Sequence, residues 1–143
     1  MSATPVGQSP PPPPPLSLHV LVVDDEFLIR WSVAETLGDD GHRVAEAGDG
    51  ESTLKTLRSE APFDIVLLDY HLPDSHDLTL LADIRRLAPQ TVVIMMTAFG
   101  TPEMIEQALG LGAFRVVPKP FDVHDIAPLI LEAHRSRPAN TPS

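Results

Sequence analysis

The sequence predicts an α/β fold in which helices cover both faces of a parallel sheet. Strand-length apolar runs alternate with helix-length segments along the chain, which is the order expected for repeated βαβ units. The first, third and fourth runs are rich in Val, Ile and Leu without polar alternation, as strands buried on both faces are. Five runs and five intervening segments predict a doubly wound (βα)₅ domain.

The strands are expected where the apolar runs lie, with a flavodoxin-like sheet order of 2-1-3-4-5. Their predicted ranges are Leu18–Asp24, His42–Ala47, Asp64–Asp69, Thr91–Met96 and Phe114–Val117.

The helices are expected from apolar residues at helical spacing, which mark the face of each helix turned toward the sheet. In chain order these faces are Phe27, Trp31, Ala34 and Leu37; Leu54 and Leu57; Leu78, Leu81, Ile84 and Leu87; Met104, Ile105, Ala108 and Leu109; and Ile126, Leu129, Ile130 and Ala133.

Cap residues support the helix starts. Asp49 and Asp122 are suited to cap the second and fifth helices, and Thr101 followed by Pro102 is a typical start for the fourth. Pro128 is expected to kink the fifth helix or to delay its start.

The 143 residues fit one domain with short tails. We assign residues 1–17, with six prolines at Pro10–Pro15, to a disordered proline-rich tail, 18–135 to the domain, and 136–143 to a tail or the start of a linker. No apolar run is long enough to cross a bilayer, and the N-terminus lacks the pattern of a signal peptide, so we expect a cytoplasmic protein.

Composition excludes several kinds of site. The chain has no cysteine, so it forms neither a disulfide framework nor a thiolate metal site. Its formal net charge of −10 would repel a phosphate backbone, which argues against direct nucleic-acid binding by this segment.

Polar side chains follow four of the predicted strands. Asp24 and Asp25 end the first run, Asp69 ends the third, Thr97 follows the fourth and Lys119 follows the fifth. Each residue alone has an ordinary explanation as a cap, a turn residue or a surface charge. Because the carboxyl ends of parallel strands meet at one edge of the sheet, their joint occurrence predicts a functional site there.

Carboxylates that converge at one edge repel each other, by about 4 kcal/mol per close pair at an effective dielectric constant near 20. A Mg²⁺ ion with oxygen ligands is the simplest compensation. Asp69 could then attack phosphorus as a carboxylate nucleophile, while Lys119 and Thr97 contact phosphoryl oxygens. The acidic loop after the first strand lacks the glycines that a dinucleotide or P-loop site needs.

These residues, in this order, resemble the receiver domain of bacterial two-component response regulators. The resemblance covers roughly residues 18 to 135 and rests on VLVVDDE, EAGDGESTL, DIVLLDYHLPD, VVIMMTAFGT and LGAFRVVPKPFD. TAFGT and the GAF…PKPFD stretch are most similar to receivers of enhancer-binding transcription activators of the nitrogen-regulatory type. The resemblance implies a phosphoacceptor that changes conformation or dimerisation to regulate an output such as transcription, rather than a turnover enzyme.

By this resemblance, Asp69 is the phosphoacceptor. Asp25 and Asp69 would bind Mg²⁺ or Mn²⁺ directly together with the backbone carbonyl of His71, and Asp24 would bind the metal or a metal-bound water. His71 and Phe99 would lie at the rim of the site and influence the lifetime of the phosphoryl group.

Thr97 and Lys119 would contact the phosphoryl group, and the small Ala98 would leave room for its donor. The Lys119–Pro120 bond would be cis. The donor would be a sensor histidine kinase, a phosphotransfer protein or a small molecule such as acetyl phosphate. A homodimer would form through the fourth helix, the fifth strand and the fifth helix, and no membrane is implied.

Two positions depart from the family pattern. Val116 stands where a switch aromatic is usual, with Phe114 and Phe99 nearby in sequence, and Asp77 stands where glycine is usual. These departures leave open a receiver-like docking module that is never phosphorylated. A second alternative, of a different class, is a phosphatase of the haloacid-dehalogenase kind, which also uses Asp, Thr, Lys and Mg²⁺ but would need an Asp-x-Asp motif after the first strand and would turn over a phosphate ester.

Overall fold

The computed structural model describes residues 16–60 and 62–136, and it confirms the predicted fold. Five parallel strands form one sheet in the order β2-β1-β3-β4-β5. No strand boundary differs from its predicted position by more than one residue. The strands are β1 (His19–Val23), β2 (Arg43–Ala47), β3 (Ile65–Asp69), β4 (Val92–Thr97) and β5 (Ala113–Pro118).

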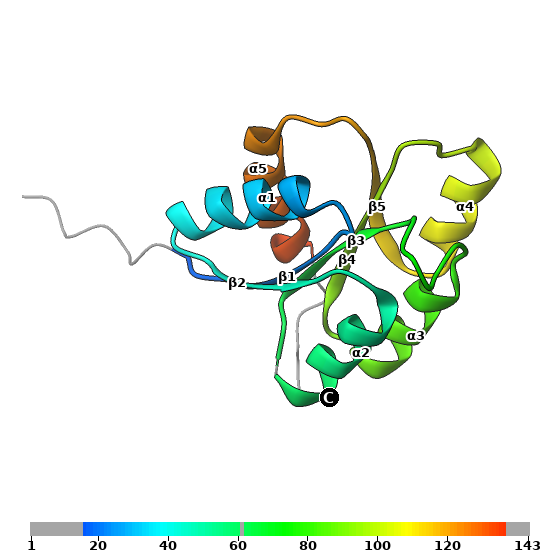
Figure 1. Ribbon diagram of the computed structural model, residues 1–143, viewed down its shortest axis with the longest axis horizontal. Coiled ribbons are helices and arrows are strands. Elements are labelled where there is room, and N and C mark those ends of the chain that lie inside the picture. The colour runs from blue at the N-terminus through cyan, green and yellow to red at the C-terminus, as the bar shows by residue number, and fades with distance from the viewer. Residues whose placement is uncertain (1–15, 61, 137–143) are drawn as a thin grey trace, which may run out of the picture.

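Helices cover both faces of the sheet (Figure 1), with α1 and α5 on one face and α2, α3 and α4 on the other. The helices are α1 (Phe27–Asp39), α2 (Gly50–Ser59), α3 (Thr79–Leu87), α4 (Pro102–Gly110) and α5 (Val123–Arg135).

The core consists of two apolar layers, one on each side of the sheet. Every residue of β1 and β3 is buried, because side chains that alternate along these strands enter both layers in turn. Leu21 and Val23 face the layer under α2, α3 and α4, whereas Val20 and Val22 face the layer under α1 and α5. This burial holds the end of β1 in a fixed position.

The predicted caps are confirmed. The carboxylates of Asp49 and Asp122 and the hydroxyl of Thr101 each accept a backbone N–H from the first turn of α2, α5 and α4, respectively. Asp77 accepts the Thr79 N–H at 2.9 Å at the start of α3. The fifth helix runs from Val123 through Pro128, so the expected delay of its start is not observed.

The predicted apolar face of α1 is partly wrong: Leu37 is buried as predicted, but two of the other predicted residues are exposed. Phe27 and Trp31 are 59% and 50% exposed, and the buried residues of this helix are Val33 and Leu37. Leu28 is also exposed. Apolar residues surround this helix, and the packing of its other side against β2 and α5 decides which of them are buried.

The predicted apolar faces of α3 and α4 are also partly wrong. Leu87 is 40% exposed at the end of α3, and Leu109 is 46% exposed near the end of α4. Each lies in the last turn of its helix. All four predicted residues of α5 are buried.

Most of the two predicted tails lies outside the described residues, which begin at 16 and end at 136. Within the described ranges, no helix is both long and apolar enough to cross a membrane.

Candidate functional site

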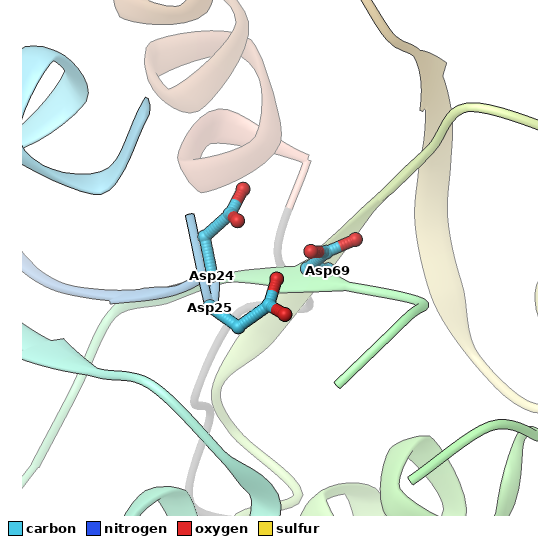
Figure 2. Close-up of side chains that lie close together, drawn as sticks. All are labelled: Asp24, Asp25 and Asp69. Atoms are coloured by element: carbon cyan, nitrogen blue, oxygen red, sulfur yellow. The ribbon is translucent and has the colours of Figure 1, made fainter. Parts of the chain in front are cut away.

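Three carboxylates meet at the carboxyl ends of the two central strands, as the sequence predicts. Val23 pairs with Leu68 in the register of β1 and β3, so Asp24 and Asp25 follow β1 beside Asp69, the last residue of β3. Each of the three offers an oxygen, and these oxygens lie within 4.8 Å of one another. Figure 2 shows the carboxylates of Asp24 and Asp25 leaving the loop in different directions, with that of Asp25 turned toward Asp69.

Lys119 brings a positive charge to the two buried carboxylates. Its Nζ atom lies 2.8 Å from Asp24 Oδ2 and 3.1 Å from Asp69 Oδ2. The Lys119 N–H donates to the Thr97 carbonyl at 2.8 Å, which ties this residue to the end of β4. The Lys119–Pro120 bond is cis, as the resemblance implied. The predicted convergence of β1, β3, β4 and β5 on one site is therefore observed.

The charges of the site are not balanced. Burial, with the nearby charge of Asp24, raises the pKa of Asp69 to about 6, although Lys119 and the His71 N–H act in the opposite direction. Burial alone would lower the pKa of Lys119, but its contacts with Asp24 and Asp69 outweigh burial and raise it. Lys119 therefore stays charged, and Asp69 is mostly ionised at pH 7 but takes up a proton in mild acid.

Thr97 is the last residue of β4, and its side chain is buried. Its hydroxyl oxygen accepts the N–H of Phe99 at 3.2 Å. This bond uses an oxygen lone pair, so the hydroxyl proton remains available to an acceptor such as a phosphoryl oxygen.

The residues predicted at the rim are exposed. Ala98 and Phe99 follow Thr97 on the loop to α4, and the Phe99 side chain is 81% exposed. His71 follows β3, and its N–H donates to Asp69 Oδ1 at 3.2 Å. Its ring contacts those of Tyr70 and His76.

The departures from the family pattern have different structural outcomes. Val116 packs against the apolar layer under α4, whereas Phe114 packs into the opposite layer, so Phe114 does not replace the missing aromatic. Asp77 has no positive φ, so this loop does not use the conformation that glycine would allow there.

Two further residues contact the site, and no role was predicted for either. Glu26 Oε1 lies 3.4 Å from Lys119 Nζ. Arg30, on the first turn of α1, donates to the Asp24 carbonyl at 2.7 Å. Glu26 could have been suspected, because it continues the acidic run after β1. Arg30 gave no signal, because its acceptor is a backbone group.

The donor set fits a hard divalent cation. Three carboxylate oxygens within reach of one another are the ligands that Mg²⁺ prefers. Asp24 Oδ2 is buried, and Lys119 Nζ lies 2.8 Å from it as an ion pair. An oxygen of this kind has a lone pair available for a cation or for its water.

Comparison with known proteins agrees with this geometry. A family model described as the response regulator receiver domain matches residues 20–131. The transcriptional regulatory protein PdtaR of Mycobacterium tuberculosis is 34% identical over 115 residues, which cover 78% of this chain and 54% of PdtaR. Sporulation initiation phosphotransferase F of Bacillus subtilis is 34% identical over 107 residues, which cover 75% of this chain and 86% of that protein.

The DNA-binding transcriptional regulator NtrC of Escherichia coli is 35% identical over 114 residues, which cover 80% of this chain and 24% of NtrC. The chain thus spans about half the length of PdtaR and about a quarter of NtrC. The solved receiver domain of NtrX from Brucella abortus is 34% identical with a TM-score of 0.74, and the match covers 82% of this chain and 98% of that one. A beryllofluoride-activated DrrB receiver domain is 31% identical with a TM-score of 0.71, covering 82% and 99%.

Proposed function

The chain belongs to the response regulator receiver domain family, and we propose that Asp69 accepts a phosphoryl group from a sensor histidine kinase or a phosphotransfer protein. The main support is the position of the Asp69 carboxylate, buried at the end of β3 with the Lys119 ammonium 3.1 Å away. Membership of this family leaves no basis for the haloacid-dehalogenase alternative.

In the proposed reaction, an Asp69 oxygen attacks the phosphorus of a phosphohistidine or of acetyl phosphate. The new P–O bond gives an acyl phosphate, and the P–N or P–O bond to the donor breaks. No general base is needed, because a pKa of about 6 leaves Asp69 mostly ionised at pH 7. Lys119 and the Thr97 hydroxyl would each contact a phosphoryl oxygen, and the small Ala98 leaves the approach open.

Asp25 and Asp69, with the backbone carbonyl of His71, would hold Mg²⁺ or Mn²⁺, and Asp24 would bind the ion or its water. When bound, the ion supplies positive charge that offsets the carboxylates and the phosphoryl oxygens. His71 and Phe99, at the rim, would influence how readily water reaches the acyl phosphate and hence how slowly it hydrolyses.

The output we propose is a change in conformation and self-association that regulates transcription. PdtaR and NtrC are named as transcriptional regulators, which supports this class of output. The proposed homodimer surface is formed by α4, β5 and α5. Leu109 and Leu111 support it, because they are 46% and 43% exposed at the end of α4.

Labelling of Asp69 tests the proposal. The domain is incubated with acetyl phosphate and Mg²⁺, and intact mass and peptide mapping count and locate the phosphoryl groups. We expect at most one group per chain, on Asp69, and no labelling of Asp69→Ala or of wild type in EDTA. Equal labelling of wild type and Asp69→Ala would refute the proposal, and a domain that is not labelled at all would favour the unphosphorylated docking module.

Light scattering tests the output separately. Beryllofluoride with Mg²⁺ imitates the acyl phosphate, and we expect it to increase the average mass of wild type but not of Asp69→Ala. Because Val116 lacks the ring of a switch aromatic, the increase should survive Val116→Ala. An unchanged mass in wild type would remove α4–β5–α5 association as the output while leaving the phosphoacceptor role intact.

A further inference from the structure

The loop that carries the two acidic residues after β1 is held from the neighbouring strand and helix. The Asp24 N–H donates to the Ala47 carbonyl at the end of β2 at 3.1 Å. The Glu26 N–H donates to Asp24 Oδ1 at 2.9 Å, so the side chain of Asp24 folds over its own loop. These two bonds fix the first residue of the pair, but neither of them fixes the peptide that joins Asp24 to Asp25.

Arg30 provides that contact. Its Nη1 atom donates to the Asp24 carbonyl at 2.7 Å, and its Nε atom donates to Glu46 Oε1 on β2 at 3.0 Å. A planar guanidinium presents donors in a rigid fork, so two acceptors on different elements hold it in one orientation. The Arg30 side chain is only 19% exposed. Its guanidinium lies over the Phe27 ring, with the Cζ atom 5.6 Å from the ring centroid.

The Asp24 carbonyl belongs to the peptide that leads into Asp25. Fixing this oxygen fixes the plane of the peptide that precedes Asp25, and the bond from the Glu26 N–H to Asp24 Oδ1 restrains the peptide that follows it, so the two contacts together set the direction in which the Asp25 side chain leaves the backbone. No hydrogen bond or ion pair to the Asp25 carboxylate occurs among the described residues, so its own contacts do not hold it in place. In Figure 2 this carboxylate is turned toward Asp69.

We propose that Arg30, paired with Glu46, is a positioning residue that holds Asp25 ready for the divalent cation. The inference rests on the proposed function for the presence of that cation. Glu46 offsets the charge of Arg30, so the guanidinium orients the loop without placing an unpaired positive charge beside a dication. Gly48 belongs to the same arrangement, because a Cβ at this position would lie 3.3 Å from Arg30 Nη1.

The chain offers a matched control for the structural part of this role. Arg115 on β5 also pairs with a glutamate, Glu132, at 2.9 Å, and also lies over an aromatic ring, that of Phe114, at 5.1 Å. It donates to no residue of the site. Arg30→Met and Arg115→Met each remove an ion pair with a glutamate and a contact with an aromatic ring, although Arg115 is the more exposed of the two, at 47% against 19%. Only the first variant removes the donor to the Asp24 carbonyl.

The experiment measures Mg²⁺ affinity by isothermal titration calorimetry on wild type, Arg30→Met and Arg115→Met at equal protein concentration. Removing a group that orients a metal ligand weakens metal binding by about 10-fold or more. We therefore expect the Kd for Mg²⁺ to rise about tenfold in Arg30→Met and to stay within about twofold of wild type in Arg115→Met. Labelling of Arg30→Met by acetyl phosphate should recover to near the wild-type rate at saturating Mg²⁺.

An unchanged Kd in Arg30→Met, an equal rise in Arg115→Met, or labelling that stays slow at saturating Mg²⁺ would overturn the proposal. If Arg30→Met does not fold, Arg30→Lys replaces it, because one ammonium cannot hold both the Asp24 carbonyl and Glu46 in a fork. Its Kd should rise about threefold, and an unchanged value counts against the proposal. A wild type that binds Mg²⁺ but is never labelled would refute the phosphoacceptor role alone.

Discussion

Polar side chains are buried at both ends of the parallel strands, along the amino edge and the carboxyl edge of the sheet, but their partners differ between the two ends. At the amino ends of the strands, buried polar groups close hydrogen bonds with the backbone. The Leu18 N–H donates to His42 Nδ1 at 3.0 Å, and the Thr91 hydroxyl donates to the Phe63 carbonyl at 2.7 Å. Each of these groups has a neutral partner, and each joins two segments that are far apart in the sequence.

At the carboxyl ends, the buried groups are charged and face one another. Asp24 and Asp69 share the single ammonium of Lys119, which lies 2.8 Å from Asp24 Oδ2 and 3.1 Å from Asp69 Oδ2. Such an arrangement lowers the stability of the fold, because buried like charges are only partly compensated. Polar groups that satisfy one another stabilise the protein, whereas the partly compensated carboxylates are where the proposed function places a cation and a phosphoryl group.

Removing the Lys119 ammonium that Asp24 and Asp69 share should have the largest effect on stability. Lys119→Met leaves Asp24 and Asp69 buried without their counter-charge, so the free energy of unfolding at pH 7 in EDTA should fall by about 3 kcal/mol. Urea unfolding measures the change. Added Mg²⁺ should restore part of the loss, because a dication replaces the missing positive charge.

The matched change at the other edge is Thr91→Val, which removes a buried donor of similar size and leaves the Phe63 carbonyl without its partner. This substitution should lower the free energy of unfolding by about 1–2 kcal/mol, and added Mg²⁺ should not restore it. A Lys119→Met domain as stable as wild type, or a Thr91→Val domain rescued by Mg²⁺, would contradict the distinction between the edges.

Neutralising Asp69 should have the next largest effect, with the opposite sign. The pKa of Asp69 is raised from 3.8 to about 6, so the folded state holds a proton that the unfolded state has already lost. The metal-free domain should therefore lose stability as pH rises from about 4 to about 6. Asp69→Asn removes this loss and should raise the free energy of unfolding at pH 7 by about 2 kcal/mol.

Urea titrations of wild type and Asp69→Asn between pH 4 and pH 7 in EDTA check this sign. Asp49→Asn is a suitable control, because hydrogen bonds to Ser52 lower the pKa of this helix cap, so its contribution to stability has the opposite pH dependence. A wild type that becomes more stable than Asp69→Asn between pH 4 and pH 6 would show that Lys119 outweighs the burial of Asp69.

The sequence carried more information about the site edge than about the surface of the fold. Each of the three uninterrupted apolar runs ended in, or was followed by, a residue whose type already suggested its chemistry, and Lys119 followed the fifth run, so Asp24, Asp69, Thr97 and Lys119 could be predicted together. Their proximity follows from the topology, because the ends of parallel strands meet at one edge. Which of them contact each other could not be predicted, because this depends on rotamers and on the loop after β5.

Helix α1 shows where sequence patterns fail. Its apolar residues lie around most of the helix, so the spacing of Phe27, Trp31 and Leu37 did not define a single face. The contact of Arg30 was equally inaccessible, because any arginine on a first turn has many possible acceptors, and a backbone carbonyl leaves no trace in the sequence. The pattern of the strands fixes what the site contains, whereas tertiary packing decides how it is held.

The smallest predicted effect concerns His42 at the amino edge, where the pH dependence should run opposite to that of Asp69. Burial lowers the pKa of His42 from 6.5, although Asp40 acts in the opposite direction. Its Nδ1 atom accepts the Leu18 N–H, so protonation there would break this bond. Because the unfolded state takes up the proton more readily, the contribution of His42 to stability is complete above about pH 6.5 and is lost as the pH falls below it.

His42→Asn keeps an acceptor near the position of Nδ1 but does not titrate. The test is made in the Asp69→Asn background, where the opposing effect of Asp69 is absent. Below pH 6.5 the free energy of unfolding should fall by about 1 kcal/mol less with His42→Asn than without it, which is the value of one buried hydrogen bond. His124→Asn alters an exposed histidine and should leave the acid side unchanged. If His42→Asn lost stability in parallel with its Asp69→Asn parent from pH 7 to pH 5, the Leu18–His42 hydrogen bond would not respond to protonation, and the amino edge would be insensitive to pH.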